Sequence, residues 1–295
     1  MLISAFQTMW SGAHAPASRP PPAGTPRGGA RRTFAGVLPV ADGSTLGGAA
    51  FRLPGAGLPH TTDGRQAAAR TLDGMRQIRI PPVAPRRPGE PEADLTALVV
   101  IHRAMLTDLD RLAAMLSSPG EPPASPERAA AVRDYTASLL TEIDHHHVNE
   151  DDVLWPVIER SAGQVIDLGP LTDDHHALAP VLARCRSVLH RDDRTLGRAL
   201  GELRDLLADH IGDEEREVFP VIRRHVPRAA LAWVAKTIEK RAPLRQMVFT
   251  VPWLARHAEP AELDRLLRDA GPPARLLLAA TRRRWRARER LVFGT

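Results

Sequence analysis

Apolar side chains recur at intervals of three and four residues in four successive segments between residues 95 and 219. This spacing places them on one face of an α-helix, so we predict helices over 95–116, 126–155, 172–190 and 195–219. Ser125 and Thr172 are the expected N-caps of the second and third helices. No segment alternates apolar and polar residues as a strand does, and the connections are short. The pattern therefore predicts an all-α protein with an up-down four-helix bundle.

The two flanks of this bundle differ from it and from each other. Residues 1–92 are rich in Pro, Gly and Arg without a sustained period, so we expect a disordered N-terminal segment. Residues 93–226 form the predicted bundle domain. Residues 227–295 form a predicted helical C-terminal extension, with helical patterns near 229–239, 242–255 and 259–285. Its tryptophans, Trp233, Trp253 and Trp285, are expected to pack it against the bundle.

Composition narrows the class of protein. The lone Cys185 excludes an intramolecular disulfide, and the longest apolar runs are too short for a bilayer span. Together with the absence of a basic, apolar leader in the first residues, this predicts a cytoplasmic protein that does not contact membranes. Apart from Lys236 and Lys240 every basic residue is an arginine, which is a general compositional bias. The net charge of +5 is therefore not taken as evidence for nucleic acid.

An internal repeat carries the candidate chemistry. The segments 146–160 (HHVNEDDVLWPVIER) and 210–224 (HIGDEEREVFPVIRR) align without gaps. Both contain a His, a Glu four positions later, a second acid, and then an aromatic residue followed by Pro-Val-Ile. Residues four apart project from one face of a helix, so His146 with Glu150 and His210 with Glu214 are two chelating pairs for a divalent transition metal.

The first and third predicted helices each add a histidine on the apolar side. His102 and His175 both precede apolar residues by three and seven positions. A lone histidine here is usually a core residue, but four His and two Glu at matched positions would be costly to bury together without a cation. His147 and His176 lie beside two of these positions. The repeat favours His146, and we assign His175 to the third helix. The predicted metal ligands are His102, His146, Glu150, His175, His210 and Glu214.

The order of these ligands, with an aromatic-Pro pair after both motifs, resembles the hemerythrin-type HHE cation-binding domain over about residues 95–225. The resemblance implies a four-helix bundle around two non-haem iron ions, with histidines as terminal ligands and Glu150 and Glu214 bridging or chelating. It also implies that the centre binds, senses or reacts with a small diatomic ligand such as oxygen or nitric oxide, or with peroxide.

The chain departs from oxygen-carrying members of that family at two points. They have a second His one turn after the first on the third helix, where this chain has Ala179. The fifth His is therefore missing or is supplied by a neighbour such as His176 or His147. Acids follow each motif histidine at both the fourth and the fifth position. These departures disfavour reversible oxygen carriage and favour a sensing or redox role, or a more labile metal site.

Two alternative functions stay open. As an enzyme the centre would turn over peroxide or nitric oxide, but no separate acid-base constellation in the sequence supports a dedicated enzyme. As a regulatory or interaction module with iron or zinc in a labile site, the chain would contact an anionic partner through its Arg-rich stretch, residues 282–290. A solvated helix end is the commoner explanation of such a run, so nucleic acid is not an expected partner.

Overall fold

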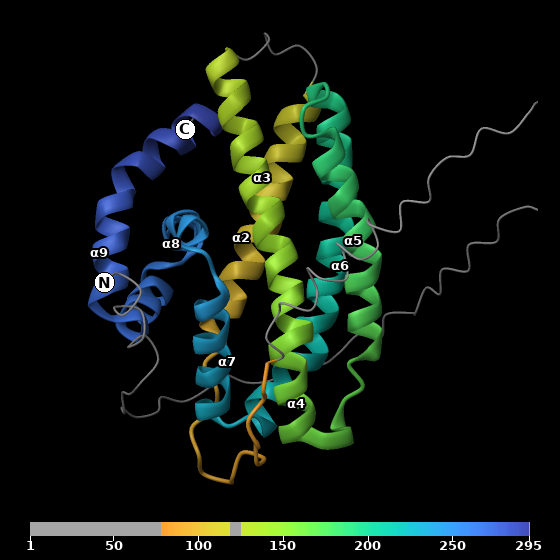
Figure 1. Ribbon diagram of the computed structural model, residues 1–295, viewed down its shortest axis with the longest axis vertical. Helices are drawn as coiled ribbons and strands as arrows, with labels where there is room; N and C mark the ends of the chain where they lie inside the picture. The colour runs from red at the N-terminus through yellow and green to blue at the C-terminus, as the bar shows by residue number, and fades with distance from the viewer. Residues whose placement is uncertain (1–77, 119–124, 295) are drawn as a thin grey trace, which may run out of the picture. The chain divides into compact units, whose positions relative to one another are not determined.

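The computed structural model describes residues 78–118 and 125–294, and all regular secondary structure in these ranges is helical (Figure 1). The predicted all-α class is thus confirmed. Among the described residues, no helix combines the length and the apolar character that a membrane crossing requires. The expected disorder of residues 1–77 concerns a segment outside the described residues. In chain order the elements are α2 (Thr96–Ser117), α3 (Pro126–Asn149), the π-helix η2 (Glu150–Leu154), α4 (Trp155–Ala162), the 3-10 helix η3 (Gly163–Val165), α5 (Gly169–Val188), α6 (Asp193–His225), α7 (Arg228–Arg241), α8 (Leu244–His257) and α9 (Pro260–Phe293).

Four long helices, α2, α3, α5 and α6, pack against one another. α6 packs against both α2 and α5, and α3 packs against α5 and, less extensively, α2 (Figure 1). Side-chain caps set two of the helix starts: the Ser125 hydroxyl accepts a hydrogen bond from the Arg128 N–H at 3.2 Å, and the Asp192 carboxylate accepts one from the Thr195 N–H at 2.9 Å. Each cap satisfies a donor that has no partner within the helix, which is worth about 1 kcal/mol. The predicted cap at Ser125 is confirmed.

Several helix boundaries differ from the prediction, among them the end of the second predicted helix, which continues past residue 155 through η2 and α4 to Ala162. α5 begins at Gly169, before the predicted N-cap Thr172, because Pro170 is well accommodated in a first turn where no N–H is needed. The Thr172 N–H instead bonds the Leu168 carbonyl oxygen at 3.1 Å, as in a regular helix. α6 continues through Pro220 to His225, beyond the predicted end at Phe219. Ile222, in this added part, is fully buried.

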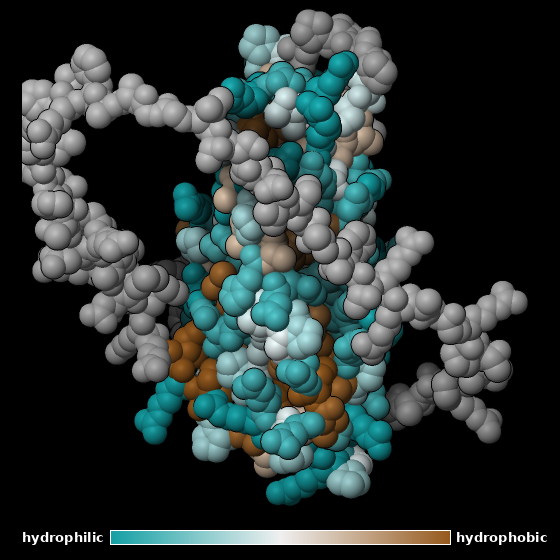
Figure 2. All heavy atoms as spheres, turned by 90° about the vertical axis from the view of Figure 1, so that its right-hand side faces the viewer, coloured by the Kyte–Doolittle hydropathy of each residue, from teal (hydrophilic) through white to brown (hydrophobic). Residues whose placement is uncertain are grey.

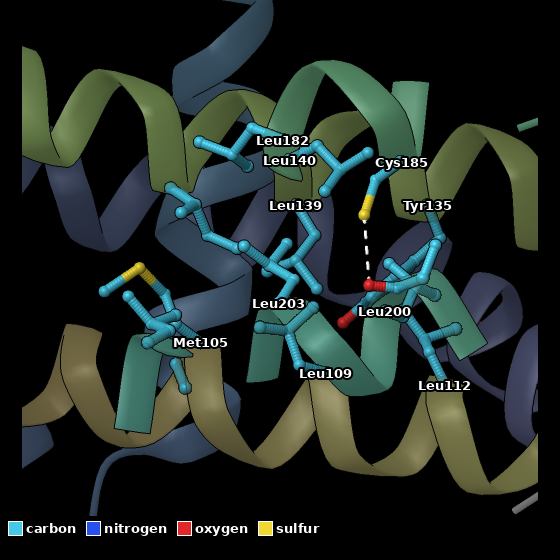
Figure 3. Close-up of a cluster of buried hydrophobic side chains, with 14 of the residues drawn as sticks. Met105, Leu109, Leu112, Tyr135, Leu139, Leu140, Leu182, Cys185, Leu200 and Leu203 are labelled. Carbon is cyan, nitrogen blue, oxygen red and sulfur yellow. Dashed lines mark hydrogen bonds between the residues drawn. The ribbon is translucent and has the colours of Figure 1, made fainter. Parts of the chain in front are cut away.

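The main core is a leucine-rich cluster between the four helices (Figure 3). Full burial of each such side chain contributes about 1.5–3 kcal/mol to folding. Cys185 lies in this cluster, where its thiol donates a hydrogen bond to the Ala199 carbonyl oxygen at 3.3 Å. Burial raises the pKa of the Cys185 thiol to about 11, so the thiol is neutral at pH 7 and packs as an apolar core residue. The labelled members of the cluster are Met105, Leu109, Leu112, Tyr135, Leu139, Leu140, Leu182, Cys185, Leu200 and Leu203.

A close approach between α2 and α6 at Gly197 provides a test of this packing. A Cβ atom at Gly197 would lie 3.0 Å from the Leu116 Cβ and 2.7 Å from the Ser117 Oγ, so the two helices would have to separate. We expect Gly197→Ala to lower the free energy of unfolding by about 1–2 kcal/mol, as measured by urea denaturation. The matched control is Gly201→Ala, one turn later, where a Cβ atom meets nothing within 4 Å. There the helix propensity of alanine should add about 0.5–1 kcal/mol. Stabilisation by both substitutions would contradict the close approach.

A second apolar cluster lies where α4, α7 and the end of α6 meet. Ile78, Ile80 and Val83 pack against it, and the Arg86 N–H bonds the His225 carbonyl oxygen at 2.7 Å. Residues 78–92 were expected to be disordered; they lack regular secondary structure but are held in place, because their apolar side chains find this cluster. Viewed from the side of α5, apolar side chains reach the surface mainly toward the end of the molecule where α4 lies (Figure 2).

The C-terminal helices are joined to the core through one buried carboxylate. The Asp108 Oδ2 atom accepts hydrogen bonds from the Tyr135 hydroxyl at 2.5 Å and from the Trp253 indole N–H at 2.9 Å, and the His257 Nε2 lies 3.2 Å away. The other oxygen, Oδ1, lies 3.2 Å from the Arg111 guanidinium. These contacts connect α2, α3 and α8, and they confirm that the C-terminal extension packs against the four helices.

The last helix, α9, consists of two segments that meet at Gly271. This glycine has φ 69° and ψ −171°, a backbone conformation that side chains disfavour, and two prolines follow it. The second segment begins at Pro272 and packs on α8, α3 and α2. Trp285 anchors it, with its ring 5.2 Å from the ring of Phe249 and 5.7 Å from that of Tyr135.

Candidate metal centre

All six predicted ligand side chains are buried and converge on one region between the helices. α2 contributes His102, α3 contributes His146, η2 contributes Glu150, α5 contributes His175, and α6 contributes His210 and Glu214. The choice between His175 and its neighbour is decided by burial, since His175 is 6% exposed and His176 points to solvent. The structure therefore brings together every side chain that the repeat and the apolar faces selected.

These side chains form two groups that share one carboxylate. The first group is His102, His146, Glu150 and Glu214, and the second is His147, Glu150, His175 and His210. Within each group the candidate ligand atoms all lie within 4.8 Å of one another.

The Glu150 carboxylate lies between the two groups. Its Oε1 atom is 3.0 Å from the His146 Nε2, in the first group, while its Oε2 atom is 3.6 Å from the His175 Nε2, in the second. Glu150 is thus the one carboxylate among these residues positioned to bridge two cations. Glu214 lies on the side of the first group, with its Oε2 atom 3.3 Å from the His102 Nε2.

His147 is the site residue that sequence reasoning did not select. Its ring centroid lies 4.6 Å from that of His175 and 5.1 Å from that of His210, and the side chain is 5% exposed. Successive residues on a helix point about 100° apart, so His146 and His147 can face different groups. The repeat gave no signal for His147 because Ile211 occupies the matching position. His147 supplies a fifth imidazole at the site. The third helix does not supply one at position 179, which is occupied by alanine.

A short π-helix positions the shared carboxylate. The Trp155 N–H bonds the Glu150 carbonyl oxygen, five residues back, so this hydrogen bond spans one residue more than in an α-helix. Such segments are rare and occur frequently at functional sites. The equivalent stretch of α6 remains α-helical. The two repeat copies therefore place their glutamates differently, one shared and one confined to the first group.

The second acid of each motif holds a histidine on a neighbouring helix. The Asp151 Oδ1 lies 2.9 Å from the His175 Nδ1, and the Glu215 Oε1 lies 2.9 Å from the His102 Nδ1. A carboxylate at Nδ1 fixes the tautomer that leaves Nε2 free for a metal. In each motif, therefore, the acid four residues after the histidine lies in the centre, and the acid five residues after it orients a histidine of another helix.

The aromatic residue of each motif covers the same histidine that its acid orients. Trp155 stacks on His175 with 5.9 Å between ring centroids, and Phe219 stacks on His102 with 5.7 Å between centroids. Two positions of the repeat, the second acid and the aromatic residue, thus make corresponding contacts in the two halves of the site. These contacts shield the imidazoles from water.

The electrostatics of this cluster fit a cation. None of the four carboxylate oxygens of Glu150 and Glu214 has a hydrogen-bond partner, and neither has the His147 Nε2. Burial raises the pKa of Glu150 to about 7 and that of Glu214 well above its usual value, while it lowers the pKa of His146 and of His210 to about 3. A buried, unpaired carboxylate costs several kcal/mol. Divalent cations bound by neutral imidazoles and carboxylates remove that cost, so these residues suit two transition-metal ions.

One of three comparisons with known proteins found a match. Residues 94–222 match the family model described as the hemerythrin HHE cation binding domain. This range contains the first repeat copy, all but the last two residues of the second, and all seven buried side chains of the centre. Neither the curated proteins nor the solved structures include a match to this chain.

Proposed function

We propose that this chain holds two non-haem iron ions and that it binds, senses or reacts with oxygen, nitric oxide or peroxide, because residues 94–222 match the model of the hemerythrin HHE cation binding domain. The observation that carries the proposal is the pair of buried His/Glu groups that share Glu150. Five imidazoles and two carboxylates are a donor set that suits iron.

The helix packing supports an up-down four-helix bundle as the scaffold. We infer that α2, α3 with its continuation through α4, α5 and α6 are its four members. The connections 118–125, 163–168 and 189–192 are short, and the helices that they join pack against each other. A short connection between packed neighbours requires antiparallel directions, and cofactor sites in bundles are built from inward side chains of facing helices.

The two groups suggest which residues hold which ion. The first ion would be held by His102, His146 and Glu214, the second by His147, His175 and His210, and Glu150 would bridge the two. His147 then takes the place of the histidine that Ala179 does not provide. This assignment revises the six-residue prediction by adding one ligand.

The residues around the centre restrict what can react there. Iron in such a site supplies a change of redox state and a coordination position for a small molecule. The chain itself contributes rigid imidazoles oriented by Asp151 and Glu215, and the rings of Trp155 and Phe219 cover the centre. Each ligand side chain is at most 8% exposed, so only a molecule of a few atoms reaches them without rearrangement. Diatomic ligands and peroxide meet that condition.

Metal content and an optical spectrum test the proposal. The full chain is purified in air and analysed for all first-row metals, then reduced without oxygen and exposed to oxygen or nitric oxide. We expect about two irons per chain, as in di-iron bundles, with ferric charge-transfer absorption that disappears on reduction. Each gas should change the spectrum of the reduced protein. A folded protein that contains one zinc or no metal would contradict the di-iron centre and leave the regulatory alternative.

The orienting acids yield a further prediction. Glu215→Ala removes the hydrogen-bond partner of the His102 Nδ1, so we expect metal affinity at the first position to fall roughly 10–100-fold. Affinity is measured by competition with a chelator of known strength. The matched control is Glu217→Ala on the same helix, whose side chain is exposed and is paired with Arg216. Equal affinities for the two variants would show that Glu215 does not support the centre.

A further inference from the structure

Charge is distributed unevenly along this chain. Residues 94–222 contain 12 basic and 24 acidic residues, whereas residues 223–295 contain 17 basic and 6 acidic ones. The small net charge of the whole chain therefore hides an acidic metal-binding domain and a basic C-terminal extension. The excess of positive charge is greatest in the second segment of α9, after Gly271, where Glu289 is the only acid.

The inward face of this segment fixes its rotation. Trp285 and Val292 are buried in the main core cluster. Glu289 accepts a hydrogen bond from the Arg256 guanidinium at 2.7 Å and lies 3.5 Å from that of Arg111. Arg288 lies over the ring of Tyr135, 5.2 Å from its centroid. Because the apolar face and the acid are used in these contacts, the opposite face of α9 points away from the protein in a defined direction.

One flank of the exposed side of this segment is lined by arginines. We call it the arginine face, and its members are all exposed: Arg275, Arg282, Arg283, Arg286 and Arg290. No ion pair joins any of them to an acid within the described part of the chain. At 1.5 Å per residue the face is about 22 Å long, and residues 282, 286 and 290 follow one another at successive turns. α9 lies at the edge of the described helices, beside α8 (Figure 1).

We propose that the arginine face binds the phosphate backbone of double-stranded nucleic acid without sequence preference. Guanidinium groups bind phosphate in a bidentate manner. Ala279, Ala280 and Ala287 have short side chains, so no bulky group stands between the arginines and a phosphate backbone. A length of about 22 Å matches the rise of six or seven base pairs. The acidic metal-binding domain repels phosphate and thus restricts contact to this face. Composition alone gave no reason to expect nucleic acid as a partner. The structure changes this expectation, because the arginines lie on one side of a helix whose rotation is fixed by its buried contacts.

The outward face of α9 is poorly suited to a lipid surface. A helix that lies in a bilayer interface inserts aromatic and large aliphatic side chains. Here Trp285, Val292 and Ala274 face the protein core, and Leu276 and Leu291 are the only large apolar side chains exposed on the segment. The inference does not depend on the metal proposal, because none of the five arginines contacts the centre.

Fluorescence anisotropy with a labelled 20-base-pair DNA duplex of arbitrary sequence tests this proposal on the full chain. We expect binding that weakens steeply as salt increases, and equal binding of a second duplex of unrelated sequence. The test variant carries Arg282→Gln, Arg283→Gln, Arg286→Gln and Arg290→Gln together. It should bind at least about tenfold more weakly, with a salt slope reduced by about 4, while its metal content is unchanged.

The control variant has the same change in net charge at four exposed arginines elsewhere. It carries Arg160→Gln, Arg191→Gln, Arg194→Gln and Arg198→Gln, all within the acidic domain, and it should bind DNA like the unchanged chain. An equal loss in both variants would mean that net charge alone matters and would overturn the proposal. So would the absence of binding at low salt, or binding to vesicles of phosphatidylserine and phosphatidylcholine but not to DNA.

Discussion

Replacing Glu150 by alanine is expected to abolish binding of both metal ions, a larger loss than the roughly 10–100-fold effect of removing an outer partner. Its two carboxylate oxygens face different groups, one toward His146 and one toward His175. Glu214→Ala should remove mainly the first ion, because Glu214 belongs to the first group alone. Elemental analysis of the purified variants measures both effects.

Two controls separate ligand loss from unfolding. Glu159→Ala changes an exposed glutamate in the same stretch of the chain and should retain the full metal content. Circular dichroism of metal-free Glu150→Ala should match that of the metal-free parent, since the leucine cluster that holds the helices together does not include Glu150. If Glu150→Ala and Glu214→Ala each lose the same single ion, Glu150 does not bridge.

Replacing Asp108 by alanine should have the largest effect on stability. The substitution leaves the Tyr135 hydroxyl, the Trp253 indole N–H and His257 buried without their shared acceptor. We expect the free energy of unfolding to fall by about 3–5 kcal/mol, the range for breaking a buried charge network. Urea denaturation measures the loss. The control is Asp110→Ala on the same helix, a 64% exposed side chain paired with Arg204, where less than about 1 kcal/mol is expected.

Asp108 also imposes a pH dependence with a definite sign. Burial alone would raise the pKa of its carboxyl, but the hydrogen bond and charge of His257, with the hydrogen bonds of Tyr135 and Trp253, hold that pKa below its usual value. Its stabilising contribution is therefore present above about pH 4, the pKa of an unfolded aspartate, and is lost as pH falls through the lower folded value. The difference in stability between the parent and Asp108→Asn should shrink in acid. A constant difference from pH 7 to pH 3 would contradict this.

The helices and most of the centre could be predicted because their signals are local. Apolar spacing of three and four residues identified the four long helices α2, α3, α5 and α6, but it did not give their exact ends or the continuation of α3 into α4. The repeat and the apolar faces of two other helices selected six of the seven buried site residues. Such patterns follow from the geometry of one helix, in which residues four apart share a face whatever the rest of the chain does.

The pairing of side chains across helices could not be predicted in that way. Glu150 is shared because its two oxygens face histidines of different helices, and His147 belongs to the second group although its neighbour His146 belongs to the first. The Asp108 network likewise joins residues up to 149 positions apart.

By itself, the sequence determined the all-α class, the repeated His/Glu motifs and the basic run at the C-terminal end, because each is written in residues close along the chain. Only the tertiary structure decided that His147 lies in the centre, that Asp151 and Glu215 orient histidines of other helices, and that the side of α9 that carries its arginines points away from the core. The physical reason is that these features depend on how each helix is rotated and placed against its neighbours. Packing of the whole core sets that arrangement, and no pattern within a single helix indicates it.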